Sequence, residues 1–371
     1  MYCIHCKREL EIANYVTGCP YCYQEGTPAA VSFLYREPLQ IDQKSSGMKR
    51  YCNMLPYGDF PTLGEGNTPL VELKALANEI GAAAVYSKNE FQNPSGSHKD
   101  RMNPLIIARA KELGYDTVAA ASSGNEGVSL ACYAALAGIK CVIVTTANMN
   151  PIWKKAISAT GAELVVKASA KERWDYILEK SEKGELYSAT NVCVPPVSSS
   201  CYGLQGYKTI SYELYEQSKG ALFDYVFVPV ARGDLLWGIY EGFRDLQDAG
   251  MLRVIPKLVA VEPFGRLEKA QSIEDCALIF SGNAEKTPSL GGDSITMQSV
   301  LAIQNSGGFA IHVSQDKVEG CVDRMARHGL YLETSAAIAV SAVENAIKMG
   351  KILRNSRICI ISTSHGYKNM I

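Results

Sequence analysis

The chain has 371 residues, of which 47% are hydrophobic and 20% are charged, and its net charge at pH 7 is −1. This is the composition of a globular protein, and the length favours two domains. A net charge so close to zero gives no electrostatic basis for binding nucleic acid or an anionic membrane, so we expect neither partner. The sequence contains no apolar run of about 18 residues and no signal-peptide pattern, so we expect no membrane span.

Cysteines form one cluster, at the N-terminus. Cys3 with Cys6 and Cys19 with Cys22 make two Cys-x2-Cys pairs, and the other cysteines are scattered. Two such knuckles can place four thiolates around Zn²⁺, and so short a segment needs the metal to fold. We therefore predict a zinc ribbon at residues 1–27. A redox pair at Cys19 and Cys22 is the alternative, although thioredoxin-like motifs follow a strand inside a larger domain. Scattered cysteines are typical of a reducing compartment, so we expect a cytoplasmic protein.

A lysine then lies at a predicted junction between a loop and a helix. A strand is predicted at residues 83–87, breakers between residues 93 and 96 open a loop, and apolar residues at helical spacing follow from 102 to 113. Lys99 therefore lies near a helix N-terminus, where free N–H groups and the helix dipole favour an anionic ligand. The same field favours the uncharged amine, which is the form that reacts with a carbonyl group. A solvated lysine among charged neighbours is the alternative interpretation.

Strands and helices alternate along the rest of the chain. Strands are predicted at 118–121, 141–145, 163–166, 225–230, 258–263, 309–313 and 358–362, and helices at 128–137, 151–160, 170–183, 237–249 and 314–329. This alternation predicts parallel sheets with helices on both faces. The first of these strands enters a loop at residues 122–127, whose N–H groups can hold a carboxylate at the start of a helix. An ordinary tight turn is the alternative for that loop.

The stretch Asn93-Pro94-Ser95-Gly96-Ser97-His98-Lys99-Asp100-Arg101 resembles the lysine motif of threonine synthases and their relatives among the fold-type II pyridoxal-phosphate (PLP) enzymes. Other motifs similar to those of the family stand in the family's order at 63–70, 122–127, 206–209, 332–337 and 363–368. The resemblance implies an α/β fold of two open, twisted domains with the cofactor between them. We expect a larger PLP-binding domain at 28–84 plus 206–371 and a smaller domain at 85–205. Some relatives carry a similar N-terminal ribbon.

The resemblance also implies roles for individual residues. Lys99 would bind the cofactor covalently and act as the catalytic base, and Asn125 would contact the cofactor's phenolic oxygen. Thr363 would hydrogen-bond the pyridine nitrogen. The cofactor phosphate is expected in the loop formed by Ala231, Arg232, Gly233, Asp234 and Leu235. The expected substrate-binding residues are Ser97, Ser122, Ser123, Gly124, Glu126 and Gly127.

Two positions depart from the family pattern. Threonine synthases carry an arginine that binds the substrate phosphate at the place where Gly203 stands. Glycine cannot replace a bidentate guanidinium contact, so the departure argues against a phosphorylated substrate. In the phosphate loop Gly233 keeps the glycine pattern, whereas Asp234 places a carboxylate beside the expected dianion and Arg232 adds a compensating cation.

We therefore expect a homodimeric PLP-dependent lyase or synthase that acts on a small amino acid by elimination or replacement at the β or γ carbon. Threonine synthase itself is one outcome. Because of Gly203, the alternative is a β-eliminating or β-replacing enzyme, such as a dehydratase, an ammonia-lyase or a cysteate-synthase-like protein. A second alternative is a non-catalytic binding protein that keeps the fold. The altered phosphate loop favours this alternative, and the intact lysine and carboxylate motifs oppose it.

Overall fold

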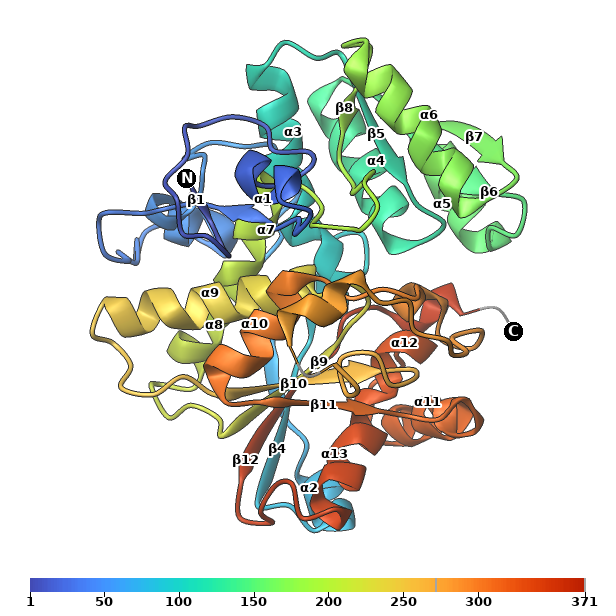
Figure 1. The fold of residues 1–371 in the computed structure, drawn as a ribbon. Coiled ribbons are helices and arrows are strands. Elements are labelled where there is room, and N and C mark those ends of the chain that lie inside the picture. The colour runs from blue at the N-terminus through green and yellow to red at the C-terminus, as the bar shows by residue number, and fades with distance from the viewer. Residues whose placement is uncertain (271, 370–371) are drawn as a thin grey trace. The chain divides into compact units, whose positions relative to one another are not determined.

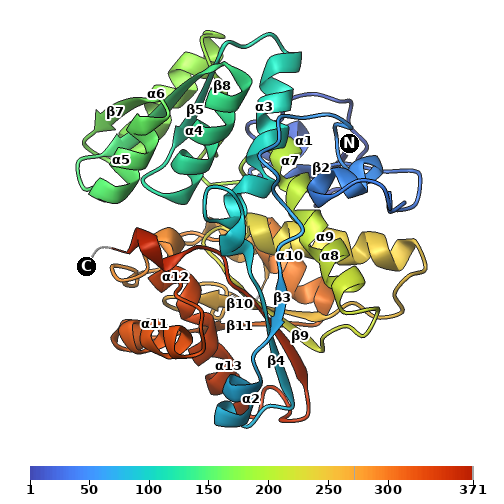
Figure 2. The same ribbon diagram turned by 180° about the vertical axis from the view of Figure 1, so that it is seen from behind.

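The structure, a computed structural model, describes residues 1–270 and 272–369, and the chain divides into two compact units (Figures 1 and 2). Residues 1–66 and 93–207 form the first unit, and residues 67–92 and 208–369 form the second. These divisions differ from the domain boundaries expected from the sequence, which stay a prediction. Within the described residues, no helix has both the length and the apolar content that crossing a membrane requires.

A short antiparallel sheet opens the first unit. It pairs β1 (Tyr2–Cys3) with β2 (Val31–Ser32), and α1 (Pro20–Gln24) lies between them in the chain. Gly18 precedes α1 with a φ of +78°, and a Cβ at this position would overlap the Ala29 carbonyl oxygen. Only glycine fits such a turn, which leads directly into the second cysteine pair.

A parallel sheet of order β7-β6-β5-β8 forms the centre of the first unit. Its strands are β5 (Thr117–Ala121), β6 (Lys140–Thr146), β7 (Glu163–Lys167) and β8 (Tyr187–Ser188), and the helices are α3 (Asn103–Glu112), α4 (Asn125–Ala137), α5 (Pro151–Ala159), α6 (Ala170–Glu182) and α7 (Cys201–Leu204). Alternate residues of a strand face opposite sides. In β6, Val142 and Val144 pack with Ile177 of α6, whereas Ile143 lies against Gly127 of α4. Different helices therefore cover the two faces.

The second unit contains a sheet of order β11-β10-β9-β12-β4-β3, in which the edge strand β3 is antiparallel to β4 and the other pairs are parallel. Its strands are β3 (Leu70–Glu72), β4 (Ala84–Lys88), β9 (Tyr225–Pro229), β10 (Lys257–Glu262), β11 (Phe309–His312) and β12 (Arg357–Ile361). Its helices are α2 (Lys74–Ile80), α8 (Lys208–Gln217), α9 (Asp234–Asp248), α10 (Met297–Ser306), α11 (Val318–Arg327), α12 (Thr334–Ala337) and α13 (Ala339–Lys348). Helices α2, α11 and α13 lie on one face of the sheet, and α8, α9 and α10 lie on the other (Figure 1). The predicted α/β class with parallel sheets is confirmed.

Candidate functional site

Lys99 lies in a 3₁₀ turn, His98–Arg101, directly before α3, as the sequence predicted. Its Nζ atom donates a hydrogen bond of 3.2 Å to the Tyr207 hydroxyl and lies 3.7 Å from Oε2 of Glu126. The Lys99 side chain is 21% exposed and that of Glu126 is 10% exposed. A partly buried amine is therefore held between a phenol and a carboxylate, in surroundings that strengthen electrostatic contacts.

A glycine allows Tyr207 to approach the lysine loop. A Cβ at Gly206 would overlap the carbonyl oxygen of Arg101, so this position accepts only glycine. Tyr207, the next residue, is fully buried. Gly206 matches a family motif in the sequence, whereas Tyr207 was not predicted as part of the site. The position of Tyr207 directly after Gly206 is the feature of the sequence that could have identified it.

Asp100 fixes the shape of the lysine loop. This fully buried carboxylate accepts hydrogen bonds from the Ser95 N–H (2.6 Å), the Ser95 hydroxyl (2.5 Å) and the hydroxyl of Ser129 on α4 (2.6 Å). Beside it, the buried Ser97 hydroxyl has no hydrogen-bond partner among the described residues. Leaving a buried hydroxyl unpaired is unfavourable, so a polar ligand group would satisfy Ser97.

The loop predicted to hold the substrate carboxylate joins β5 to α4. The Ser122 hydroxyl accepts hydrogen bonds from the N–H groups of Gly124 (3.2 Å) and Gly127 (2.9 Å), so it shapes the loop from inside. A Cβ at Gly124 would lie 3.0 Å from the ring of Trp153, which therefore packs against the loop backbone. Asn125 is the first residue of α4, and it is buried.

A cation also reaches this loop. The Ser123 hydroxyl accepts a hydrogen bond of 3.1 Å from Nη1 of Arg173 on α6 and lies 2.9 Å from the Thr145 hydroxyl on β6. Neither Arg173 nor Thr145 was predicted from the sequence as part of the site. Arg173 is 50 positions from Ser123 in a helix rich in charged residues, and nothing in the sequence pattern distinguishes it from its neighbours.

In the second unit, the predicted phosphate loop joins β9 to α9. Gly233 has a φ of +88°, and a Cβ there would overlap Ser299, so a glycine is required. The helix begins at Asp234 without a side-chain cap, which leaves N–H groups at a positive helix end. The Asp234 carboxylate accepts a hydrogen bond from the Gln298 amide, and the Thr296 hydroxyl donates one of 2.6 Å to the Arg232 carbonyl. Such a helix start suits a phosphate group.

Thr363 follows β12, the neighbour of β9 in the sheet, and it is 6% exposed. The adjacent Ser362 hydroxyl lies 2.7 Å from that of Ser87 on β4, which ties the strand end in place. Within this unit, an N–H-rich helix start and a hydroxyl thus lie at the carboxyl ends of neighbouring strands, where open α/β sheets bind ligands. These groups fit the phosphate and the ring nitrogen of PLP.

The position of the missing arginine is closed. Gly203 lies in α7, and a Cβ there would be 2.5 Å from Cγ of Met102 and 2.8 Å from Cγ1 of Ile106. Helix α7 therefore packs directly against α3, with no room for a side chain. The absence of a guanidinium here follows from helix packing.

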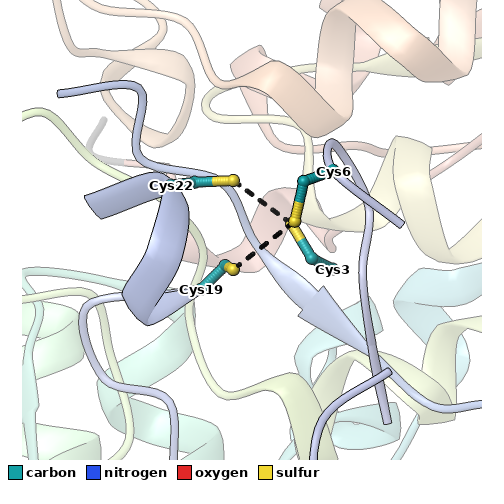
Figure 3. A group of neighbouring side chains, drawn as sticks. All are labelled: Cys3, Cys6, Cys19 and Cys22. Carbon is teal, nitrogen blue, oxygen red and sulfur yellow. Dashed lines mark hydrogen bonds between the residues drawn. The ribbon is translucent and has the colours of Figure 1, made fainter. Parts of the chain in front are cut away.

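The four predicted zinc ligands lie together at the N-terminus (Figure 3). The sulfur atoms of Cys3, Cys6, Cys19 and Cys22 are all within 4.8 Å of one another. The Cys3 and Cys22 sulfurs are 3.6 Å apart, those of Cys6 and Cys19 are 3.9 Å apart, and Nδ1 of His5 lies 3.6 Å from the Cys22 sulfur. Burial raises the pKa of Cys3 to about 11, so this thiol keeps its proton until a cation displaces it.

The architecture is that of the fold-type II PLP enzymes. The processed form of threonine deaminase isoform 2 from Solanum lycopersicum matches with a TM-score of 0.68 and 22% identity, over 82% of this chain and 84% of that chain. A fungal L-serine ammonia-lyase from Rhizomucor miehei matches with a TM-score of 0.66 and 22% identity, over 80% and 93%. At these identities the likeness concerns the fold alone.

Sequence comparison identifies the family. Residues 61–364 match the model of the pyridoxal-phosphate dependent enzymes, and the chain belongs to that family. A threonine synthase from Methanocaldococcus jannaschii is 27% identical over 384 aligned positions that include 99% of this chain and 92% of the relative. One from Halalkalibacterium halodurans is 28% identical over 330 positions, with 87% and 89% covered. The predicted resemblance is confirmed: the chain is a PLP-dependent lyase of the type that eliminates or replaces a group at the β or γ carbon.

Proposed function

We propose that this enzyme removes or replaces the substituent on the β carbon of a small, unphosphorylated amino acid. The observation that carries the proposal is the closed packing around Gly203, which leaves no space for an arginine that would bind a substrate phosphate. Amino-acid substrates without phosphate need no such clamp. The rest of the site supports this choice, because the carboxylate of Glu126 beside Lys99 would repel a phosphate group.

Lys99 is the residue that we assign to covalent cofactor binding and proton transfer. When bound, PLP supplies an electron sink that stabilises negative charge on the substrate's α carbon. The Nζ atom of Lys99 would hold PLP covalently and, once free, would accept the substrate's α proton. Tyr207 orients Nζ through its hydroxyl, and Asp100 keeps the loop rigid.

The remaining residues hold the substrate and the cofactor. The substrate carboxylate accepts hydrogen bonds at the loop 122–127, with Arg173 supporting it through Ser123. Asn125 would contact the phenolic oxygen of PLP, and residues 231–235 would hold its phosphate. The Thr363 hydroxyl would donate a hydrogen bond to the unprotonated ring nitrogen, because a hydroxyl cannot keep that nitrogen protonated as a carboxylate would. We also include in the proposal a structural zinc in the ribbon, a homodimeric state and a cytoplasmic location.

Borohydride reduction tests the assignment of Lys99. The purified protein should be yellow, and reduction followed by peptide mapping should place one pyridoxyl group on Lys99. Lys99→Ala should lose the label, whereas Lys111→Ala, which removes an exposed lysine from α3, should keep it. A label on a different lysine, or no label on the wild-type protein, would contradict the assignment.

A second candidate function is threonine synthesis, because threonine synthases are among the relatives. A substrate screen separates the two functions. O-phosphohomoserine, serine, threonine, O-phosphoserine and diaminopropionate are incubated with the enzyme, and phosphate, ammonia and oxoacid release are measured. We expect ammonia and oxoacid from an unphosphorylated substrate. A higher kcat/KM for O-phosphohomoserine than for every other compound would establish threonine synthesis instead.

A further inference from the structure

Glu126 is the carboxylate that lies 3.7 Å from the amine of Lys99. It is the second residue of α4, where the helix dipole stabilises a negative charge, and its side chain is 10% exposed. Both residues belong to the first unit, and Lys99 also donates a hydrogen bond to Tyr207. Proton transfer between an ammonium and a carboxylate needs about 2.6–3.2 Å between the heavy atoms, or one bridging water. At 3.7 Å the pair can therefore exchange a proton after a small side-chain movement or through one bridging water.

We propose that Glu126 is the acid that protonates the leaving group, and that the substrate therefore carries a hydroxyl or amino group on its β carbon. The inference rests on the proposed function, in which Lys99 accepts the α proton. Hydroxide and amide ions are poor leaving groups and need a proton as their bond to carbon breaks. Phosphate and halide ions leave as stable anions and need none.

The protons and electrons of this elimination balance within Lys99, Glu126 and the substrate. Lys99 removes the α proton, and the electron pair of that bond becomes the second bond between the α and β carbons. The bond from the β carbon to oxygen or nitrogen breaks, and its electron pair leaves with that atom. The proton passes from Lys99 to Glu126 and from Glu126 to the leaving atom, which departs as water or ammonia. Both residues return to their initial protonation states, and no other reactant is consumed.

The surrounding charges favour the same substrate class. A leaving group that is itself an anion would approach the Glu126 carboxylate with like charge, which is unfavourable at short range. A neutral hydroxyl or a neutral amine meets no such repulsion. The closed packing at Gly203 points in the same direction, because it excludes a phosphate-binding arginine from α7. Tyr207 is the competing acid, since its hydroxyl is 3.2 Å from the Lys99 amine.

Substrates with different leaving groups distinguish an acid from a residue that only positions Lys99. The holoenzyme and its variants are assayed for pyruvate release from L-serine, diaminopropionate and β-chloro-L-alanine, whose chloride leaves without a proton. Glu126→Gln should lower kcat/KM for serine or diaminopropionate by about 10²–10⁴-fold. For β-chloroalanine the loss should be below about 3-fold, because the step that Glu126 serves is absent. Tyr207→Phe, the matched control, should affect all three substrates by similar factors.

Two further measurements separate the loss of an acid from the loss of folding or of bound cofactor. Glu126→Asp retains an acid and should recover part of the serine or diaminopropionate activity. PLP content and borohydride labelling of Lys99 should be the same in Glu126→Gln and wild type, which shows that the variant is folded and loaded. An unlabelled wild-type Lys99 would defeat the proposed function itself. Equal losses on all substrates, a leaving-group-dependent loss in Tyr207→Phe, or a wild-type preference for O-phosphoserine or β-chloroalanine alone would overturn the role of Glu126.

Discussion

Gly203 shows how one residue limits the choice of substrate. Its α-carbon faces Met102 and Ile106 so closely that a Cβ atom would be 2.5 Å from the nearer side chain. Sequence comparison with the family suggests that an arginine could be restored at this position. The packing predicts otherwise, because a larger side chain would push α7 away from α3.

We therefore predict that Gly203→Arg destabilises the protein and does not create O-phosphohomoserine activity. Overpacking of a filled interior costs roughly 1–3 kcal/mol, and burying an arginine adds to that cost. Thermal unfolding should report a lower Tm, and kcat/KM for O-phosphohomoserine should not rise. Gly320→Arg serves as control, because Gly320 is exposed on α11 and a Cβ there meets no atom within 4 Å. A stable Gly203→Arg enzyme that gains phosphate-releasing activity would show that α7 can move.

Among the elements, helix α9 begins with a negative charge, that of Asp234, at the expected position of the cofactor phosphate. Asp234 lies where PLP phosphate is expected, and two negative groups about 4 Å apart repel by roughly 4 kcal/mol at an effective dielectric near 20. Unopposed, this repulsion would weaken binding about a thousandfold. The Gln298 amide donates a hydrogen bond to the Asp234 carboxylate and gives it a partner other than the phosphate. Arg232, two residues earlier, is the other group that offsets the charge.

A double-mutant cycle on Arg232 and Asp234 separates these two explanations. If Arg232 compensates for Asp234, Arg232→Ala should weaken PLP binding strongly, and adding Asp234→Gly should restore part of it. If Gln298 holds the carboxylate away, both single changes should be nearly neutral. We expect the second outcome, because the Gln298 contact is formed within the unit. PLP dissociation constants from absorbance titration decide, and strong coupling between the two changes would refute the expectation.

The cysteine ribbon is the element for which we predict metal binding. Its four sulfur atoms already lie within 4.8 Å of one another, so zinc should bind without rearrangement of the chain. Metal analysis of the purified protein should give about one zinc per chain. Cys3→Ser combined with Cys19→Ser should remove it, whereas Cys52→Ser, outside the cluster, should not. Zinc content that survives the double change would rule out this site.

The sequence predicted elements better than contacts, for physical reasons. Strand and helix periodicity and the ordered motifs located the parallel sheets, the position of Lys99 before α3 and the cysteine cluster. They could not reveal that Tyr207 and Glu126 both face the lysine amine, because those contacts join positions 108 and 27 residues away from Lys99. The hydrogen bond from Arg173 to Ser123 was hidden for the same reason. Such contacts depend on how α4, α6 and α7 pack, which periodicity does not specify.

For the whole molecule, cofactor binding should raise the free energy of unfolding and the Tm. A ligand that binds the folded state alone stabilises it by about 2.7 kcal/mol at a hundredfold excess over its Kd. With an unfolding entropy near 2.1 cal/mol/K per residue, a chain of 371 residues should then gain about 3 °C in Tm.

Cofactor analogues show how much of this rise in Tm comes from the phosphate contact and how much from the bond to Lys99. Pyridoxal lacks the phosphate for the start of α9, and pyridoxine phosphate lacks the aldehyde that reacts with Lys99. If both attachments stabilise the fold, each analogue should raise the Tm of the apoprotein less than PLP does at equal concentration. Lys99→Ala should abolish the difference between PLP and pyridoxine phosphate, because the aldehyde then has no amine to bind. Scanning calorimetry of wild type and Lys99→Ala with the three compounds measures these shifts. A difference that persists in Lys99→Ala would mean that the aldehyde contributes to stability through another residue.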